Sequence, residues 1–235
     1  MSILLEPTED APSRVAWTMA DGELVATSCP SGWRLDRSWG ADPLFTTHRP
    51  RLRLGIGTGI VIASLDAPTV IAPRTSGVEW WLSWPLAVEV IAPGGEIIEQ
   101  WRPGLRRTLF GAIHDGGVES TVRCTHLPDP DATAMSPPAA LHVVVDSRAA
   151  GPITLRRFPV DEALLSLARA DRRFVCGSVR VRVEDGQRAE VETRPLPAIG
   201  GFAPVPRDRP ASSPDRVPTL SWLLDATRRS VEFQP

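Results

Sequence analysis

Apolar and polar residues alternate along most of the chain in short runs, the pattern of half-buried β-strands. In residues 78–84 (VEWWLSW), Val78, Trp80, Leu82 and Trp84 fall on one face and Glu79, Trp81 and Ser83 on the other. Proline and glycine punctuate the chain about every ten residues. Similar runs are RVAWTM (14–19), ELVAT (23–27), RLRLG (51–55), GIVIAS (59–64), LAVEVIA (86–92), IIEQW (97–101), ALHVVV (140–145) and PITLRRF (152–158). The pattern predicts an all-β fold, an antiparallel β-sandwich in one body or two packed subdomains.

Residues 178–194 contain the clearest hairpin. A two-residue Asp185–Gly186 turn would set valines opposite charged residues, whereas a three-residue loop, 185–187, matches the faces. That register sets Arg182 opposite Glu190 and Arg180 opposite Glu192, and it predicts a solvated charged sheet face.

Helical spacing is rare. Leu164, Leu167 and Ala168 predict a short helix within 160–173, and 219–235 reads as a second helix or tail that Thr219 caps. Residues 203–218 form a proline-rich linker, which leaves 1–200 as the sandwich domain with a subdivision near residue 73 as an alternative.

The net charge is −2, so no overall basic field attracts nucleic acid. No apolar run has the length of a membrane span, and the N-terminus lacks the basic start of a secretory signal. Three cysteines without metal-type spacing favour a soluble, cytoplasmic protein. Lysine and tyrosine are absent, which excludes a Schiff-base lysine, a Walker lysine and a tyrosine acid or base.

Few motifs point to chemistry. The glycines of GIGTG (55–59) lack a dinucleotide fingerprint, and no G-x-S-x-G occurs. Cys124 and His126 share a strand face, and His142 with Asp115 would complete a zinc set. Histidines at strand ends and a buried cysteine would account for the same residues without a metal, so a metal-assisted or acid/base enzyme is only an alternative.

The chain has eight tryptophans, three of them within 78–84. Trp80 and Trp84 suit the core, which leaves Trp81 to be explained. An outward Trp81 predicts a glycan-binding sheet face as a second alternative, and cover by a neighbouring segment is the plainer interpretation.

A basic hairpin is expected over 104–124, where GLRRTLFG precedes GGVESTVRC. If its strands are adjacent, Arg107 and Arg123 share a face beside Gly111 and Gly117, an arrangement that suits a carboxylate or phosphate. The alternative is an arginine paired with a nearby acid, which would only hold the hairpin closed.

Within residues 50–195 the chain resembles the uncharacterised family called domain of unknown function 432. The matching positions are Pro85, Val88, Val90, Arg107, Leu109, Phe110, Gly111, Gly117 and Arg123. The resemblance implies an all-β fold and brings no established activity. The sequence therefore favours a non-catalytic module, without a cofactor, that binds a protein or small anionic ligand around Arg107 and Arg123.

Overall fold

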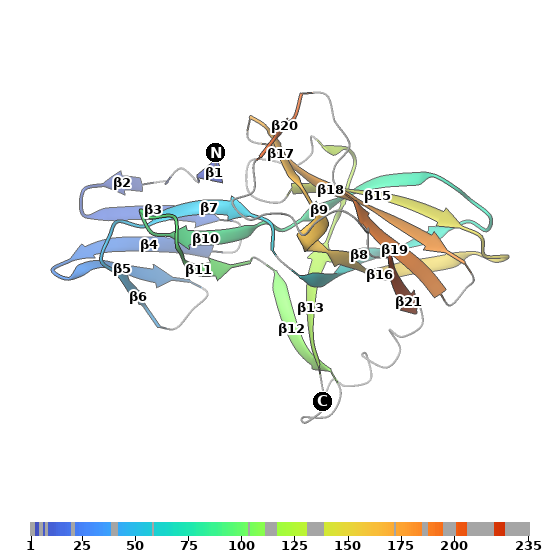
Figure 1. The fold of residues 1–235 in the computed structure, drawn as a ribbon, viewed down its shortest axis with the longest axis horizontal. Coiled ribbons are helices and arrows are strands. Elements are labelled where there is room, and N and C mark those ends of the chain that lie inside the picture. The colour runs from blue at the N-terminus through green and yellow to red at the C-terminus, as the bar shows by residue number, and fades with distance from the viewer. Residues whose placement is uncertain are drawn as a thin grey trace. The chain divides into compact units, whose positions relative to one another are not determined.

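The computed structural model describes residues 3–4, 7, 9–19, 22–38, 42–57, 59–102, 104–110, 117–130, 139–171, 173–184, 188–194, 201–205 and 219–223. The chain divides into two compact units, each built from β-strands (Figure 1). Unit 1 consists of residues 1–55 and 86–103, and unit 2 of residues 56–85 and 104–235. The alternative boundary near residue 73 falls inside unit 2. No helix in these ranges is long and apolar enough to cross a bilayer.

Unit 1 contains two antiparallel sheets, with strand orders β1-β7-β10-β11 and β2-β3-β4-β5-β6. An ion pair between Arg37 of β5 and Glu99 of β11 joins the two sheets. The strands are β1 (Ile3–Leu4), β2 (Glu9–Ala11), β3 (Arg14–Met19), β4 (Gly22–Cys29), β5 (Gly32–Arg37), β6 (Leu44–Thr46), β7 (Arg51–Gly55), β10 (Ala87–Ile91) and β11 (Ile97–Trp101).

Alternation explains the core of unit 1. In β7, Leu52 and Leu54 are buried and Arg51 is exposed. Every residue of β10 is buried, including Glu89, whose carboxylate accepts hydrogen bonds from Arg53 at 2.7 Å and from Gln100 at 3.1 Å. A buried carboxylate needs such partners to stay charged.

Unit 2 also has two sheets. One has the order β12-β13-β8-β16; the other runs β14-β9-β15-β18-β17-β20, with β19 pairing β18 and β21 pairing β19. The strands are β8 (Ile60–Ile71), β9 (Val78–Trp84), β12 (Leu105–Phe110), β13 (Gly117–Cys124), β14 (His126–Leu127), β15 (Ala139–Ser147), β16 (Ile153–Asp161), β17 (Leu167–Ala170), β18 (Arg173–Val183), β19 (Arg188–Arg194), β20 (Ala203–Pro204) and β21 (Thr219–Leu223).

The predicted all-β fold is confirmed, and most strand pairs are antiparallel. Two pairs are parallel instead, β13 with β8 and β15 with β18. β18 changes partner along its length, from β17 to β19, at a bulge next to Gly177. Gly177 has a φ of 47°, a conformation that glycine adopts without strain.

The predicted register of residues 178–194 is confirmed, because Arg180 lies opposite Glu192 and Arg182 opposite Glu190. The predicted loop itself, 185–187, lies outside the described residues. The predicted faces of 78–84 are clearest toward the end of β9, where Leu82 and Trp84 are fully buried, whereas Glu79 is exposed and Trp80 is half-buried.

The helix predicted within 160–173 is confirmed only as one short turn, and the helix predicted from residue 219 is wrong over the residues that the structure describes. Only Glu162–Leu164 is helical, as the short 3-10 helix η2, and Leu167–Ala170 forms β17 between β18 and β20. Thr219–Leu223 forms β21, and residues 224–235 lie outside the described part. In both places a sheet edge supplies backbone hydrogen bonds, which overrides a weak helical spacing.

Candidate functional site

Arg107 and Arg123 do not converge. β12 and β13 are antiparallel neighbours, as predicted, but the register sets Arg107 opposite Ser120 and Arg106 opposite Thr121. Directly opposed residues share a face, and successive residues alternate. Arg123 therefore shares the face of Arg106, opposite that of Arg107. Gly117 ends the hairpin opposite Phe110, and Gly111 lies outside the described residues.

The candidate metal ligands are also separated. His126 pairs with Leu82 and His142 with Trp81, so the two imidazoles belong to opposite faces of one sheet. His126 Nε2 lies 3.0 Å from Thr69 Oγ1, and Cys124 is buried. Asp115 lies outside the described residues, and no three potential ligands cluster among the residues that are described.

Trp81 has a structural neighbour. Its ring lies against the imidazole of His142, with ring centroids 4.7 Å apart, and it is half-buried. His142 Nε2 is 3.3 Å from Glu79 Oε2 on the same face. Cross-strand contacts of this kind stabilise a sheet, so they account for Trp81 without a ligand.

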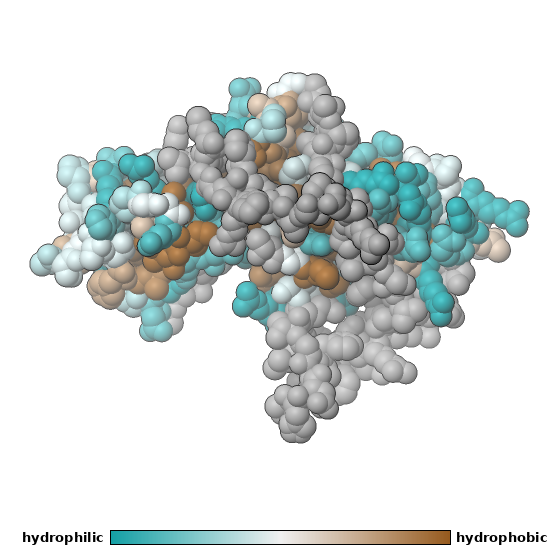
Figure 2. Space-filling model, in the orientation of Figure 1, coloured by the Kyte–Doolittle hydropathy of each residue, from teal (hydrophilic) through white to brown (hydrophobic). Residues whose placement is uncertain are grey.

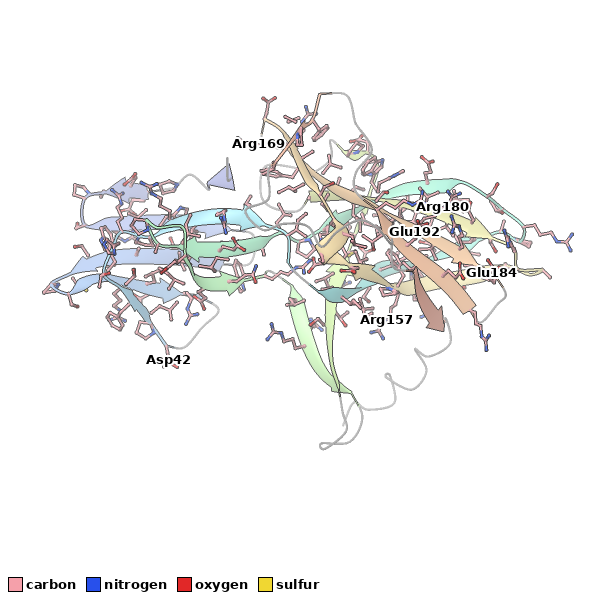
Figure 3. All side chains as sticks on the ribbon, viewed as in Figure 1. Asp42, Arg157, Arg169, Arg180, Glu184 and Glu192 are labelled. Atoms are coloured by element: carbon pink, nitrogen blue, oxygen red, sulfur yellow. The ribbon has the colours of Figure 1, made fainter. Side chains whose placement is uncertain are left out.

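The charged residues gather elsewhere, on the outer face of the sheet that contains β15, β18 and β19. Figure 2 shows hydrophilic side chains over β15 and β18, and Figure 3 shows Arg180 and Glu192 close together on this face. Arg180 Nε donates to Asp146 Oδ2 at 2.6 Å, and Glu192 accepts from Arg194 at 2.7 Å. Arg182 lies 3.5 Å from Glu192. The charges thus form a cross-strand lattice.

At one end of this lattice lies a hollow of about 550 Å³, which we call the arginine hollow. It is lined by residues 74–76 of the β8–β9 connection, 146–148 at the end of β15, and 180 and 182–184 of β18. Its volume is in the range of small-molecule sites. Its charged lining residues are Arg74, Asp146, Arg148, Arg180, Arg182 and Glu184, an excess of two positive charges.

Hydrogen bonds attach the β8–β9 connection to β15. Arg74 N–H donates to the Ala149 carbonyl at 3.2 Å, Ser147 N–H to the Thr75 carbonyl at 2.6 Å, and Gly77 N–H to Asp146 Oδ1 at 2.9 Å. Arg74 has a φ of 52°, in the left-handed region that costs a non-glycine residue about 1 kcal/mol or more. The surrounding bonds hold this strained residue at the rim of the hollow.

Asp146 is the organising acid of the hollow. The hydrogen bond from Arg180 lowers the pKa of Asp146 below its ordinary value, with a further contribution from Gly77 N–H, against the opposing effect of burial. The same hydrogen bond raises the pKa of Arg180. Asp146 therefore stays ionised, and Arg180 is committed to it.

The other three arginines of the hollow retain N–H groups that could donate hydrogen bonds to a ligand. Arg148 is 3.3 Å from Glu184, and Arg182 is 3.5 Å from Glu192, which is not among the residues that line the hollow. Arg74 makes no ion pair with an acid in the described ranges. Ser147 is 3% exposed, and its hydroxyl has no hydrogen-bond partner among the residues that the structure describes. A buried hydroxyl without a partner costs about 1–3 kcal/mol.

Sequence reasoning missed the arginine hollow. It identified Arg180 and Arg182 but assigned them to a solvated face. The missed signal is the outward series His142, Val144, Asp146 and Arg148, which continues the alternation of β15 and brings a second charged strand beside β18.

Comparison with protein-family models, with curated proteins and with solved structures finds no match for this chain. The resemblance to domain of unknown function 432 therefore stays a prediction.

Proposed function

We propose that unit 2 binds a small anionic ligand, a carboxylate or a phosphate, in the arginine hollow. The observation that carries this proposal is the lining itself: four arginines from three chain segments surround two acids. Guanidinium groups present five N–H donors in a fork that matches carboxylate and phosphate oxygens.

Two features of the hollow support a ligand rather than a closed salt-bridge lattice. Its charged lining residues carry an excess of two positive charges, which a bound anion would balance. Strained residues such as Arg74 also concentrate at binding sites, because the strain is kept only where the surrounding structure enforces it.

The arginines of the hollow have different proposed roles, according to the hydrogen bonds and ion pairs that each already makes. Arg180 is the positioning residue, since its hydrogen bond to Asp146 fixes both side chains. Arg74, Arg148 and Arg182 are the proposed ligand contacts. No nucleophile or acid/base pair is required, so the proposed activity is binding and not catalysis. A cytoplasmic location belongs to the same proposal, and three free cysteines support it.

The test is titration calorimetry of the full chain with inorganic phosphate and with citrate at low ionic strength. We expect saturable heat that added salt weakens. Arg74→Gln and Arg182→Gln should weaken binding at least tenfold. The matched control is Arg156→Gln, which removes an exposed arginine on β16, outside the hollow. Absence of saturable heat, or an equal loss in the control, would overturn the proposal.

A further inference from the structure

The last described strand, β21, forms the edge of the larger sheet of unit 2. Its five residues pair antiparallel with β19, from Thr219 opposite Glu192 to Leu223 opposite Arg188. β19 uses its other edge for β18. Residues 206–218 separate β21 from β20, so this segment is the covalent connection between β21 and the preceding described strand, and the backbone ladder pairs β21 with β19.

The ladder has a specific register. Leu220 is opposite Val191 and Trp222 is opposite Ala189, two residues of β19 that are 1% exposed, whereas Ser221 is opposite the exposed Glu190. A shift by one residue would place Leu220 and Trp222 opposite the charged positions of β19. The edge of β19 therefore favours a strand in which apolar residues alternate with polar ones, as they do over residues 219–222.

The geometry points to an exchangeable strand: we propose that Thr219–Leu223 of a second copy of this chain replaces β21 on β19, in a reciprocal dimer. A second copy carries the matching pattern by definition. The same hydrogen bonds form within one chain or between two, so the balance depends on the connecting segment and on chain concentration.

The connecting segment permits both arrangements at its natural length. The two ends of the segment can be located along β18. Val205 N–H donates to the carbonyl of Leu167, and Leu167 lies opposite Cys176 of β18. Thr219 lies opposite Glu192, and Glu192 lies opposite Arg180 of β18, four residues further along the strand. Four residues along a strand correspond to roughly 13 Å. Thirteen connecting residues, 206–218, reach at most about 45 Å. With Pro218 alone, the span from Val205 to Thr219 falls to about 7 Å, which is too short for pairing within one chain.

The first experiment compares the full chain with a variant lacking residues 206–217, by light scattering during size-exclusion chromatography. For the full chain we expect monomers at micromolar concentration and a rising dimer fraction toward ~1 mM, a typical effective concentration for a short tether. The shortened variant should be dimeric already at micromolar concentration. A shortened variant that stays monomeric with an unchanged far-ultraviolet circular dichroism spectrum would overturn the proposal.

A second experiment does not depend on the folding of the shortened variant. Glu190→Cys with Ser221→Cys, in a Cys29→Ser background, places thiols at directly opposed positions. Two differently tagged versions of the full chain are mixed at high concentration and oxidised. Exchange predicts a disulfide between tags, and disulfides confined to single chains would contradict it. The matched control is Glu192→Cys with Leu223→Cys, whose positions are not opposed, and it should give no such product.

Discussion

Gly177 shows how one residue fixes a change of strand partners. At its φ of 47°, a Cβ atom would lie 2.8 Å from the Arg194 carbonyl oxygen and 2.5 Å from Leu165 Cδ2. Gly177→Ala should lower the free energy of unfolding by about 1–3 kcal/mol, because both the backbone conformation and the space favour glycine.

Urea denaturation measures this loss. Gly151→Ala is the control, since Gly151 has open space around its Cβ position and no left-handed φ. It should change stability by less than about 0.5 kcal/mol. Equal effects of the two substitutions would mean that the bulge at Gly177 does not require glycine.

Asp146 predicts a pH dependence of stability. The hydrogen bond from Arg180 lowers the pKa of Asp146 in the folded state, so the ionised carboxylate stabilises the fold above the ordinary pKa of 3.8. This contribution disappears as the pH falls through the lowered folded-state pKa. Asp146→Asn should therefore be less stable than the wild type at pH 7.

Urea denaturation at pH 7 and pH 3 tests this expectation. The difference between wild type and Asp146→Asn should shrink as the pH falls from 7 to 3, because below the ordinary pKa of 3.8 the unfolded chain takes up a proton on Asp146 more readily than the folded chain does. A difference that stays constant with pH would show that the substitution acts through packing instead.

Residue-level prediction of the site failed for a geometric reason. Whether Arg107 and Arg123 share a face depends on the register of β12 and β13, and a shift of one residue would reverse the result. The turn between these strands carries no signal strong enough to set that register. In residues 178–194, by contrast, valines alternate with charges on both arms, and only one register matches the faces.

The β18–β19 hairpin makes a prediction at the scale of the element. Glu192 accepts from Arg194 and lies near Arg182, whereas Glu190, two residues away on the same face, forms no ion pair within the described part. Glu192→Gln should lower the free energy of unfolding by about 0.5–1 kcal/mol. Glu190→Gln is the matched control and should be nearly neutral.

Thermal unfolding at low and high salt separates these outcomes. Because the Glu192 contacts are ionic and partly exposed, its substitution should matter less in 1 M salt. If Glu190→Gln lowers the stability as much as Glu192→Gln does, the charges of this face act through their summed potential and not through defined ion pairs.

The two misassigned helices show the limits of element prediction. Residues 219–222 read T-L-S-W, a period-two pattern, so a strand signal was present, and Pro218 followed by Thr219 obscured it because this pair also suits the start of a helix. In β17, Leu167, Ala168 and Ala170 are buried and Arg169 alone is exposed, so residues of both faces are covered. A short strand that is buried on both faces gives no clean alternation, and local sequence cannot distinguish it from a short helix.

At the scale of the whole molecule, unit 1 is assembled from two separate segments. Gly55 of β7 lies directly opposite Ala87 of β10, so residues 56–85 leave and return at neighbouring positions. Replacing 56–85 by a two- to four-residue Gly-Ser linker in a chain of residues 1–103 should therefore close a β-hairpin. We expect this polypeptide to unfold cooperatively on heating.

Circular dichroism tests that expectation. Residues 1–55 alone are the control, and they should show no cooperative transition because they lack β10 and β11. If the linked chain behaves like the control, unit 1 is not an independent folding unit.

The all-β class was predictable because alternation and turn residues are local signals. Two subdomains were an alternative from the sequence, but the boundaries of the two units were not predictable, since they rest on β7 pairing with β10 across intervening strands of the other unit. Strand pairing at such sequence distance leaves no local pattern. For the same reason, the sequence did not predict that β8–β9 and β15 contribute to one hollow.

The interleaved segments also determine the order in which the strands of each unit leave the ribosome during synthesis. β7 emerges before β8 and β9, yet its partner β10 follows them, while β8 and β9 await β13, β15 and β16. A nascent chain that ends near residue 85 thus carries two incomplete sheets with open edges. Neither can close during early synthesis, and unpaired apolar edges invite aggregation. Slow translation between residues 55 and 101 would therefore lengthen the period in which chaperones must protect this chain.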